Sequence, residues 1–88
     1  MKMPLNYAIL KYFTTVDEAS VDQVMEALRG EYGDYKAFKK AAMTEAVMTA
    51  ESNALVTESR FELDDKGDLQ IYYSSDADQK KTINSYIN

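Results

Sequence analysis

Apolar residues follow a helical spacing near the start of the chain. They fall at i, i+3, i+4, i+7 and i+8 on one face, and the positions are Leu5, Ala8, Ile9, Tyr12 and Phe13. Pro4 suits the first turn of a helix, because the N–H that proline lacks would make no helical bond there. The pattern predicts a first helix over about residues 4–14, with its apolar face in the core.

A second amphipathic stretch begins with a helix start signal. Ser20 and Gln23 have the spacing of a capping box, in which each side chain accepts a bond from the other residue's backbone N–H. Apolar residues then share one helical face, at Val21, Val24, Met25 and Leu28. Arg29 in the last turn and Gly30 just beyond it are stop signals. These features predict a second helix over about residues 20–29.

The longest helical pattern follows a connection that contains Gly30 and Gly33, after which Asp34 can cap a new helix. Tyr35, Phe38, Ala42 and Ala46 share one apolar face by helical spacing, and Met43, Val47 and Ala50 widen that face on one flank. We expect a third helix over about residues 34–51, and we expect this face to be the core on which the other elements close. Two helices joined by a short glycine-bearing turn also have the outline of a helix-turn-helix.

The pattern changes from helical to alternating after Asn53. One side of the first strand is predicted to hold Leu55, Thr57, Ser59, Phe61 and Leu63, and the other Val56, Glu58, Arg60 and Glu62. A polar turn with Gly67 separates this strand, predicted over about residues 55–63, from a second over about 69–74. Because an isolated hairpin is marginal in water, we expect its apolar face to lie on the helices.

The last stretch predicts a tail helix over about residues 76–87. Ser74, Ser75 and Asp76 supply caps, and the helix has a narrow apolar edge at Ile83, Tyr86 and Ile87. That edge, or the first helix, would serve a homodimer. The predicted fold class is α+β, as a single domain over residues 1–88 with a three-helix core, a two-stranded hairpin and a C-terminal helix.

Composition argues against an enzyme. The chain has no cysteine and no histidine, so it lacks a thiolate nucleophile, the usual general base and the usual metal ligand. A domain of 88 residues buries only ~60% of the surface that its unfolded chain exposes, which makes a deep active site hard to build. We therefore predict a non-enzymatic protein without a cofactor. The start of the chain has no signal-peptide h-region, and no run approaches ~20 apolar residues, so we expect a cytoplasmic protein without a membrane span.

The net charge of −5 disfavours indiscriminate phosphate binding. Lysines nevertheless cluster in the third predicted helix, where Lys36, Lys40 and Thr44 recur at i, i+4 and i+8 on an outward stripe with Lys39 beside it. A local basic face can bind DNA on an acidic domain. The alternative is an ordinary solvated face, because exposed lysines are common.

The order of predicted elements adds a family resemblance. The run E-A-S-V-D-Q-V-M-E-A-L into the second helix, and A-V-M-T-A-E-S-N-A-L-V-T-E-S out of the third, resemble winged helix-turn-helix domains over about residues 5–74. In that family the third helix enters the DNA major groove and the hairpin wing touches the backbone or the minor groove. The resemblance implies double-stranded DNA as partner, with DNA-facing residues Lys36, Lys39, Lys40, Thr44, Arg60 and Lys66.

A second similarity brings no established activity. The segments A-L-V and I-Y-Y, with the closing I-N-S-Y-I, are similar to small uncharacterised proteins carried by mobile elements of gut Firmicutes.

The chain departs from a DNA-binding winged helix in two respects. The outward face of its third helix has no arginine, and from Glu58 to Asp68 the hairpin carries five carboxylates against Arg60 and Lys66, a net charge of −3. An acidic wing would be repelled by phosphates. Two hypotheses follow: a small DNA-binding regulator or accessory factor, and a protein–protein interaction module that uses an acidic surface and exposed tyrosines such as Tyr72.

Overall fold

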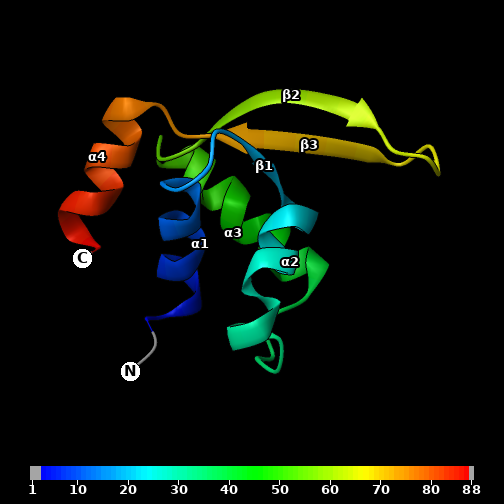
Figure 1. Cartoon of the computed structure of the whole chain (residues 1–88), viewed down its shortest axis with the longest axis horizontal. Helices are drawn as coiled ribbons and strands as arrows, with labels where there is room; N and C mark the ends of the chain where they lie inside the picture. The colour runs from blue at the N-terminus through cyan, green and yellow to red at the C-terminus, as the bar shows by residue number, and fades with distance from the viewer. Residues whose placement is uncertain (1–2, 88) are drawn as a thin grey trace.

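Four helices and a three-stranded antiparallel sheet make up the part of the chain that the computed structural model describes, residues 3–87. In chain order the elements are α1 (Leu5–Phe13), β1 (Ala19–Ser20), α2 (Val21–Tyr32), α3 (Lys40–Ser52), β2 (Thr57–Leu63), β3 (Leu69–Ser74) and α4 (Ala77–Tyr86). The helices lie on one side of the sheet, and the β2–β3 hairpin reaches past them as an arm (Figure 1). The predicted α+β class is confirmed.

The sheet has one strand more than the two that the sequence predicts. Its order is β1-β3-β2, and β1 adds Ala19 opposite Tyr73 and Ser20 opposite Tyr72. A strand of two residues is too short to show alternation, and Ser20 also serves as the N-cap of α2. In the sequence, Ser20 indicates only a helix cap, so β1 is not predicted. The prediction of a two-stranded sheet is wrong.

The second helix begins as predicted and ends later. Ser20 Oγ accepts from the Gln23 N–H (3.2 Å) and Gln23 Oε1 accepts from the Ser20 N–H (3.1 Å), which completes the capping box. The helix then passes Gly30 and stops at Tyr32, with Gly33 as its C-cap. Tyr32 is 2% exposed and its hydroxyl donates to the Met3 carbonyl (2.6 Å). Burial of this ring favours another turn of helix over a stop at Gly30.

The third helix begins at Lys40, six residues after the predicted start at Asp34. Residues 33–39 instead form turns, in which the Phe38 N–H donates to the Tyr35 carbonyl (3.0 Å) and Lys39 has an extended φ of −134°. Phe38 is buried and lies below the Arg29 guanidinium, which is 5.6 Å from the ring centroid. Tyr35 is 39% exposed and is not the core residue that helical spacing predicts. The turn buries Phe38 and leaves Tyr35 at the surface.

The main core lies between α1, α2, α3 and the base of the sheet, and α4 adds buried side chains where it packs on α1. Its most completely buried large side chains are Phe13, Ile9, Met43, Ile83, Val24, Val47 and Val56. On α3 the buried face is formed by Met43, Val47 and Ala50, which the sequence had placed on one flank of the apolar stripe.

Helix α4 lies against α1, at the end of the molecule opposite the hairpin tip (Figure 1). Ile83 is 0% and Ile87 3% exposed, and Lys11 on α1 donates to the Asn84 side-chain oxygen (2.6 Å). The side chain of Tyr86 lies outside the described part of the chain. Because Ile83 and Ile87 are buried within the chain, they offer no surface for the predicted tail-helix dimer. A dimer through α1 stays a prediction.

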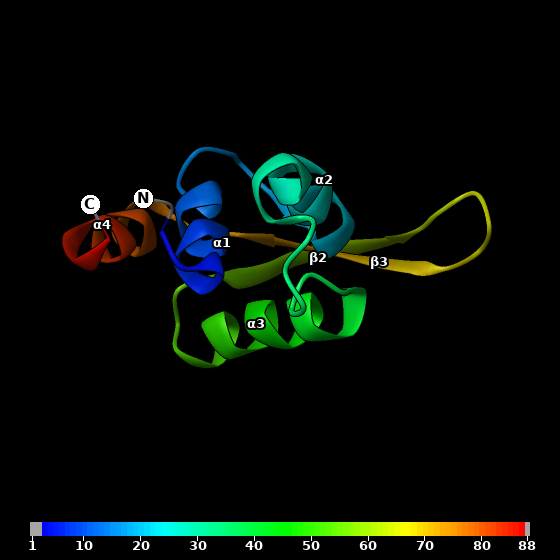
Figure 2. The same cartoon turned by 90° about the horizontal axis from the view of Figure 1, so that it is seen from below.

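The hairpin is buried at its base and exposed toward its tip. Tyr73 is 4% and Val56 1% exposed, whereas Phe61, Leu63 and Leu69 toward the tip are 67%, 68% and 56% exposed. Figure 2 shows the arm extending beyond α2 and α3. The prediction that the apolar face of the hairpin lies on the helices is therefore wrong for its outer half.

A β-bulge changes which side chains share that face. Glu58 is opposite Tyr73 and Arg60 is opposite Tyr72, so Ser59 is the extra residue of β2. Beyond the bulge, Phe61 pairs with Ile71 and Leu63 with Leu69. The bulge brings Glu58 to the same face as Phe61, where strict alternation predicted the opposite face.

Candidate interaction surface

The residues that the winged-helix resemblance implies for DNA do not form one helical stripe. Lys36 lies in the connection between α2 and α3, Lys39 is the N-cap of α3, and Lys40 is the first residue of that helix. Only Lys40 and Thr44 are one helical turn apart. The i, i+4, i+8 arrangement predicted for Lys36, Lys40 and Thr44 is therefore wrong, because the helix begins later.

Lys40 is engaged with carboxylates. Its Nζ lies 2.5 Å from Asp22 Oδ1 and so connects the start of α3 to the start of α2. Both side chains are 54% exposed, so the pair contributes only ~0.2–1 kcal/mol to stability. Lys40 also lines an open groove that it shares with Asp64, Asp65 and Asp68 of the hairpin turn. The positive charge that DNA binding would need lies beside negative charge.

Thr44 faces the hairpin. It is half-buried and lines a small hollow with Val21, Leu69 and Ile71. Sequence spacing had placed it on an outward face. Thr44 lies beside the hairpin because β3, at Leu69 and Ile71, runs along this side of α3.

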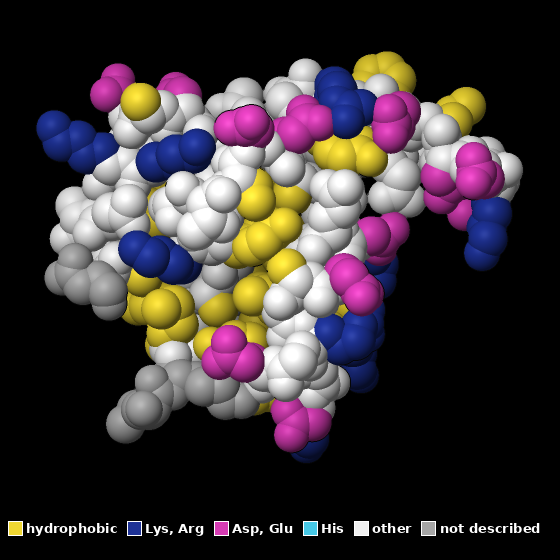
Figure 3. Space-filling view, viewed as in Figure 1, with side chains coloured by type: hydrophobic (Ala, Val, Ile, Leu, Met, Phe, Trp, Pro, Cys, Tyr) yellow, Lys and Arg dark blue, Asp and Glu magenta, His cyan; other side chains and the backbone are white. Residues whose placement is uncertain are grey.

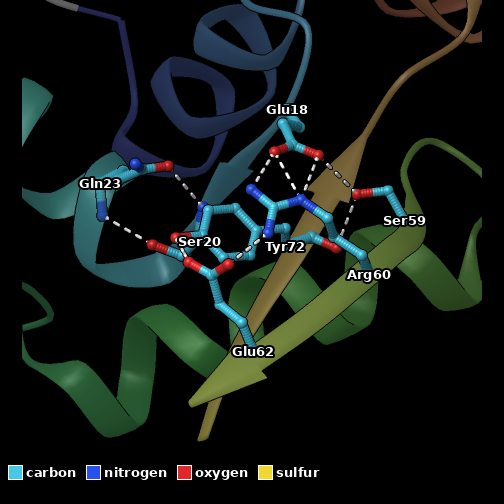
Figure 4. A network of polar contacts seen from close by, with 7 residues as sticks. All are labelled: Glu18, Ser20, Gln23, Ser59, Arg60, Glu62 and Tyr72. Atoms are coloured by element: carbon cyan, nitrogen blue, oxygen red, sulfur yellow. Dashed lines mark hydrogen bonds and ion pairs between the residues drawn. The ribbon is translucent and has the colours of Figure 1, made fainter. Parts of the chain in front are cut away.

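Arg60 is the centre of a polar network on the face of the hairpin opposite Phe61 (Figure 4). Its Nη2 lies 2.5 Å from Glu18 Oε2 and its Nη1 2.7 Å from Glu62 Oε2. The guanidinium carbon lies 4.0 Å from the Tyr72 ring centroid, and the Tyr72 hydroxyl donates to Glu62 (3.0 Å). Arg60 is thus held by two carboxylates and a ring, and Tyr72 is half-buried beneath it.

Hydrogen bonds within this network shift the acidity of its members. Donation from Arg60 is the largest cause that lowers the pKa of Glu18, and it is also the largest cause for Glu62. Donation to Glu62 raises the pKa of the Tyr72 phenol. The two carboxylates therefore stay ionised, and they compete with any phosphate for the Arg60 donors.

Lys66 sits in the hairpin turn among aspartates. Asp64 Oδ1 accepts from the N–H groups of Lys66 and Asp68 (both 2.9 Å), and Gly67 adopts a φ of +82°. These backbone bonds, with that of Asp68 the largest cause, lower the pKa of Asp64. Asp64 is therefore built into the turn itself. In residues 3–87, no group of three or more acidic side chains is placed to hold a metal ion.

The surface that the sequence did not single out is apolar. Phe61, Leu63 and Leu69, which we call the hairpin apolar face, are all more than half exposed. Figure 3 shows hydrophobic and acidic side chains together along the arm. The signal in the sequence was the alternation of these residues, which also fits a strand that is buried on one side. A projecting strand and a strand buried on one side show the same alternation, and they differ only in how far the hairpin extends beyond the helices.

The solvent side of α3 is also poor in positive charge. After Lys40 its exposed residues are Ala41, Glu45, Met48, Thr49 and Ser52, and Met48 is 52% exposed. Glu45 lies in the middle of this side.

Two further carboxylates, Glu51 and Glu58, lie near the buried Tyr73. Burial is the largest cause that raises the pKa of the Tyr73 phenol, and the two carboxylates raise it further.

Comparison with models of known protein families found none that matches the chain, and none of the curated proteins compared with it matches either. None of the helices that the structure describes is long and apolar enough to cross a membrane.

Proposed function

We propose that the chain is a non-enzymatic, winged-helix-like module that binds a partner protein through the hairpin apolar face and the acidic residues around it. The observation that carries the proposal is the exposure of Phe61, Leu63 and Leu69 on an arm that projects from the core. Three large apolar side chains in solvent weaken solubility, and such patches mark interaction sites in soluble proteins.

The arrangement of elements supports the winged-helix part of the proposal. The order α1-β1-α2-α3-β2-β3, with β3 between the other two strands and a projecting hairpin, fits a helix-turn-helix followed by a wing. In the family that the sequence resembles, the third helix and the wing are the parts that touch the partner. In this chain, the same parts carry Met48, Phe61 and Leu63.

The charges favour a protein over DNA. Affinity for DNA depends on cations that neutralise phosphates. Arg60 is paired with Glu18 and Glu62, Lys40 is paired with Asp22, and Lys66 lies among aspartates. Lys36 and Lys39 remain as exposed cations near α3. A partner with apolar and basic residues would fit this surface better than a phosphate backbone.

The proposal is tested by affinity capture with the wild-type chain and with a Phe61→Ser, Leu63→Ser, Leu69→Ser triple variant. We expect a protein captured after nuclease treatment to be lost with the triple variant and kept with the control Tyr7→Ser, which removes an apolar side chain of 43% exposure on α1. Equal capture by the wild-type chain and the triple variant would contradict the proposal.

DNA binding is the second candidate, and exposed Lys36 and Lys39 near the start of α3 favour it. In a gel-shift assay at ~50 mM salt, where electrostatic affinity is strong, this candidate predicts a shift that the Lys36→Ala, Lys39→Ala, Lys40→Ala variant loses. No shift with random duplex at that salt would remove it.

A further inference from the structure

β2 is the outer strand of the sheet and is open along one side. The strand order β1-β3-β2 leaves its outer edge without a neighbouring strand among residues 3–87. All seven residues from Thr57 to Leu63 are exposed. An open edge presents N–H and C=O groups that can pair with another chain.

The register shows which backbone groups face outward. The Asp64 N–H donates to the carbonyl of Asp68 (2.9 Å), directly after the Leu63–Leu69 pair. Opposite residues in an antiparallel ladder alternate between hydrogen-bonded and non-hydrogen-bonded pairs. The backbone N–H and C=O groups of Glu62 therefore bond to β3. Those of Phe61 and Leu63 point to the open edge.

The edge lacks several of the usual protections. β2 contains no proline, and its bulge lies at Glu58–Arg60 near the base, so the stretch from Phe61 to Leu63 pairs regularly with β3. The charged side chains Arg60 and Glu62 are bonded to each other on the face opposite Phe61.

The two faces beside this edge have different chemistry. Phe61 and Leu63 make one face apolar in the outer half of β2, and Glu58 lies on the same face nearer the base. On the other face, Glu62 lies directly opposite Gln70, whose side chain donates to Asp64 two positions further along the chain (3.3 Å). Glu18 joins them through Arg60, so three carboxylates on that face accompany one cation. A strand added at this edge would need apolar residues on one face and basic residues on the other.

We infer that β2 pairs, by strand addition, with an extended segment of a partner protein in which apolar residues alternate with Lys or Arg. The inference rests on the proposed function and specifies how the partner binds. Backbone bonds at Phe61 and Leu63 would hold the segment, its apolar side chains would extend the hairpin apolar face, and its cations would meet Glu62 and Asp64. A second copy of the chain fits less well, because each hairpin from Glu58 to Asp68 has a net charge of −3.

The test uses a synthetic peptide of sequence Thr-Lys-Val-Lys-Val-Lys-Val-Lys-Thr with acetyl and amide ends, titrated into the isotope-labelled chain. We expect backbone amide shifts centred on Phe61 and Leu63, and slower hydrogen exchange at those two amides in the complex. The matched control is the same peptide with its three valines N-methylated, which removes the donors of one edge and keeps every side chain. We expect it to bind at least tenfold more weakly.

Two variants of the chain test the backbone bonds of β2 to the peptide by changing Leu63. Leu63→Ala removes an exposed side chain, and Leu63→Pro also removes the outward N–H without taking a bond from the hairpin. We expect Leu63→Pro to bind the peptide at least fivefold more weakly than Leu63→Ala. The methylated peptide keeps the inference testable if Leu63→Pro does not fold.

The outcomes separate the inference from the proposed function. Equal binding of the methylated and unmethylated peptides, or no binding of either, overturns strand addition, while capture that depends on Phe61, Leu63 and Leu69 would still stand. A concentration-dependent dimer in sedimentation, with β2 amides protected in the absence of peptide, would show a second copy as the occupant and would also overturn the inference.

Discussion

At the scale of single residues, the Arg60 network explains why a cation on the wing is a poor marker of a phosphate site. Its guanidinium is shared between Glu18 and Glu62 and lies over the Tyr72 ring. Glu18 is 42 positions before Arg60 in the sequence, so the pairing depends on the antiparallel contact between β1 and β3. The excess of acidic residues in the sequence could suggest that Arg60 is paired with a carboxylate. It could not identify Glu18 as that partner.

The network predicts a pH dependence of stability. In the folded chain the pKa values of Glu18 and Glu62 lie below their ordinary value of 4.5, so their contribution is fully present above that pH and is lost as the pH falls through the lowered values. We expect Arg60→Met to show a smaller drop in melting temperature than the wild-type chain between pH 6 and pH 3. Melting curves followed by circular dichroism measure this, and equal drops would show that the network does not contribute.

A second prediction at this scale contrasts a buried with an exposed apolar residue. Ile83→Ala should lower the free energy of unfolding by about 2–5 kcal/mol, because the side chain is fully buried. Phe61→Ala should change it by less than about 0.5 kcal/mol, because the ring is 67% exposed. Urea denaturation of both variants makes the comparison, and a large loss in Phe61→Ala would mean that the hairpin tip packs on the core.

At the scale of elements, paired capping boxes proved more reliable than single start or stop residues. The capping box at Ser20 and Gln23 is formed as predicted, and a second one, Asp76 with Gln79, starts α4. Where a single residue marks a boundary, what the chain buries decides whether the helix begins or ends there. Gly30 does not end α2 because Tyr32 is buried two residues later, and Asp34 does not start α3 because Phe38 packs below Arg29. The sequence contains these residues, but their tertiary partners decide the boundary.

The capping box gives an element-scale prediction. Ser20→Ala should destabilise the fold by about 1 kcal/mol, because the Gln23 N–H loses its acceptor at a site that is 2% exposed. Ser52→Ala, at the exposed end of α3, is the control and should change the free energy of unfolding by less than about 0.5 kcal/mol. Urea denaturation tests both variants, and equal effects would remove the special role of Ser20.

At the scale of the whole molecule, the helices and the base of the sheet form the core while the outer hairpin stays apart from it. Periodicity could predict the α+β class, the order of the helices and the hairpin. It could not separate an apolar strand face that is buried from one that projects, because Tyr73, Ile71 and Leu69 alternate in the same way from base to tip. Periodicity also predicted the lysines on one stripe of the third helix. Because the α2–α3 turn extends to Lys39, Lys36 and Lys39 lie outside that helix.

The proposed function is that the apolar hairpin tip meets a partner protein. The most direct measurement is in-cell photo-crosslinking with p-benzoylphenylalanine in place of Phe61, and with the same residue in place of Tyr7 as control. We predict a discrete crosslinked protein from position 61, resistant to nuclease and absent from position 7. A crosslink from position 61 that nuclease removes, or equal protein crosslinks from both positions, would contradict the claim.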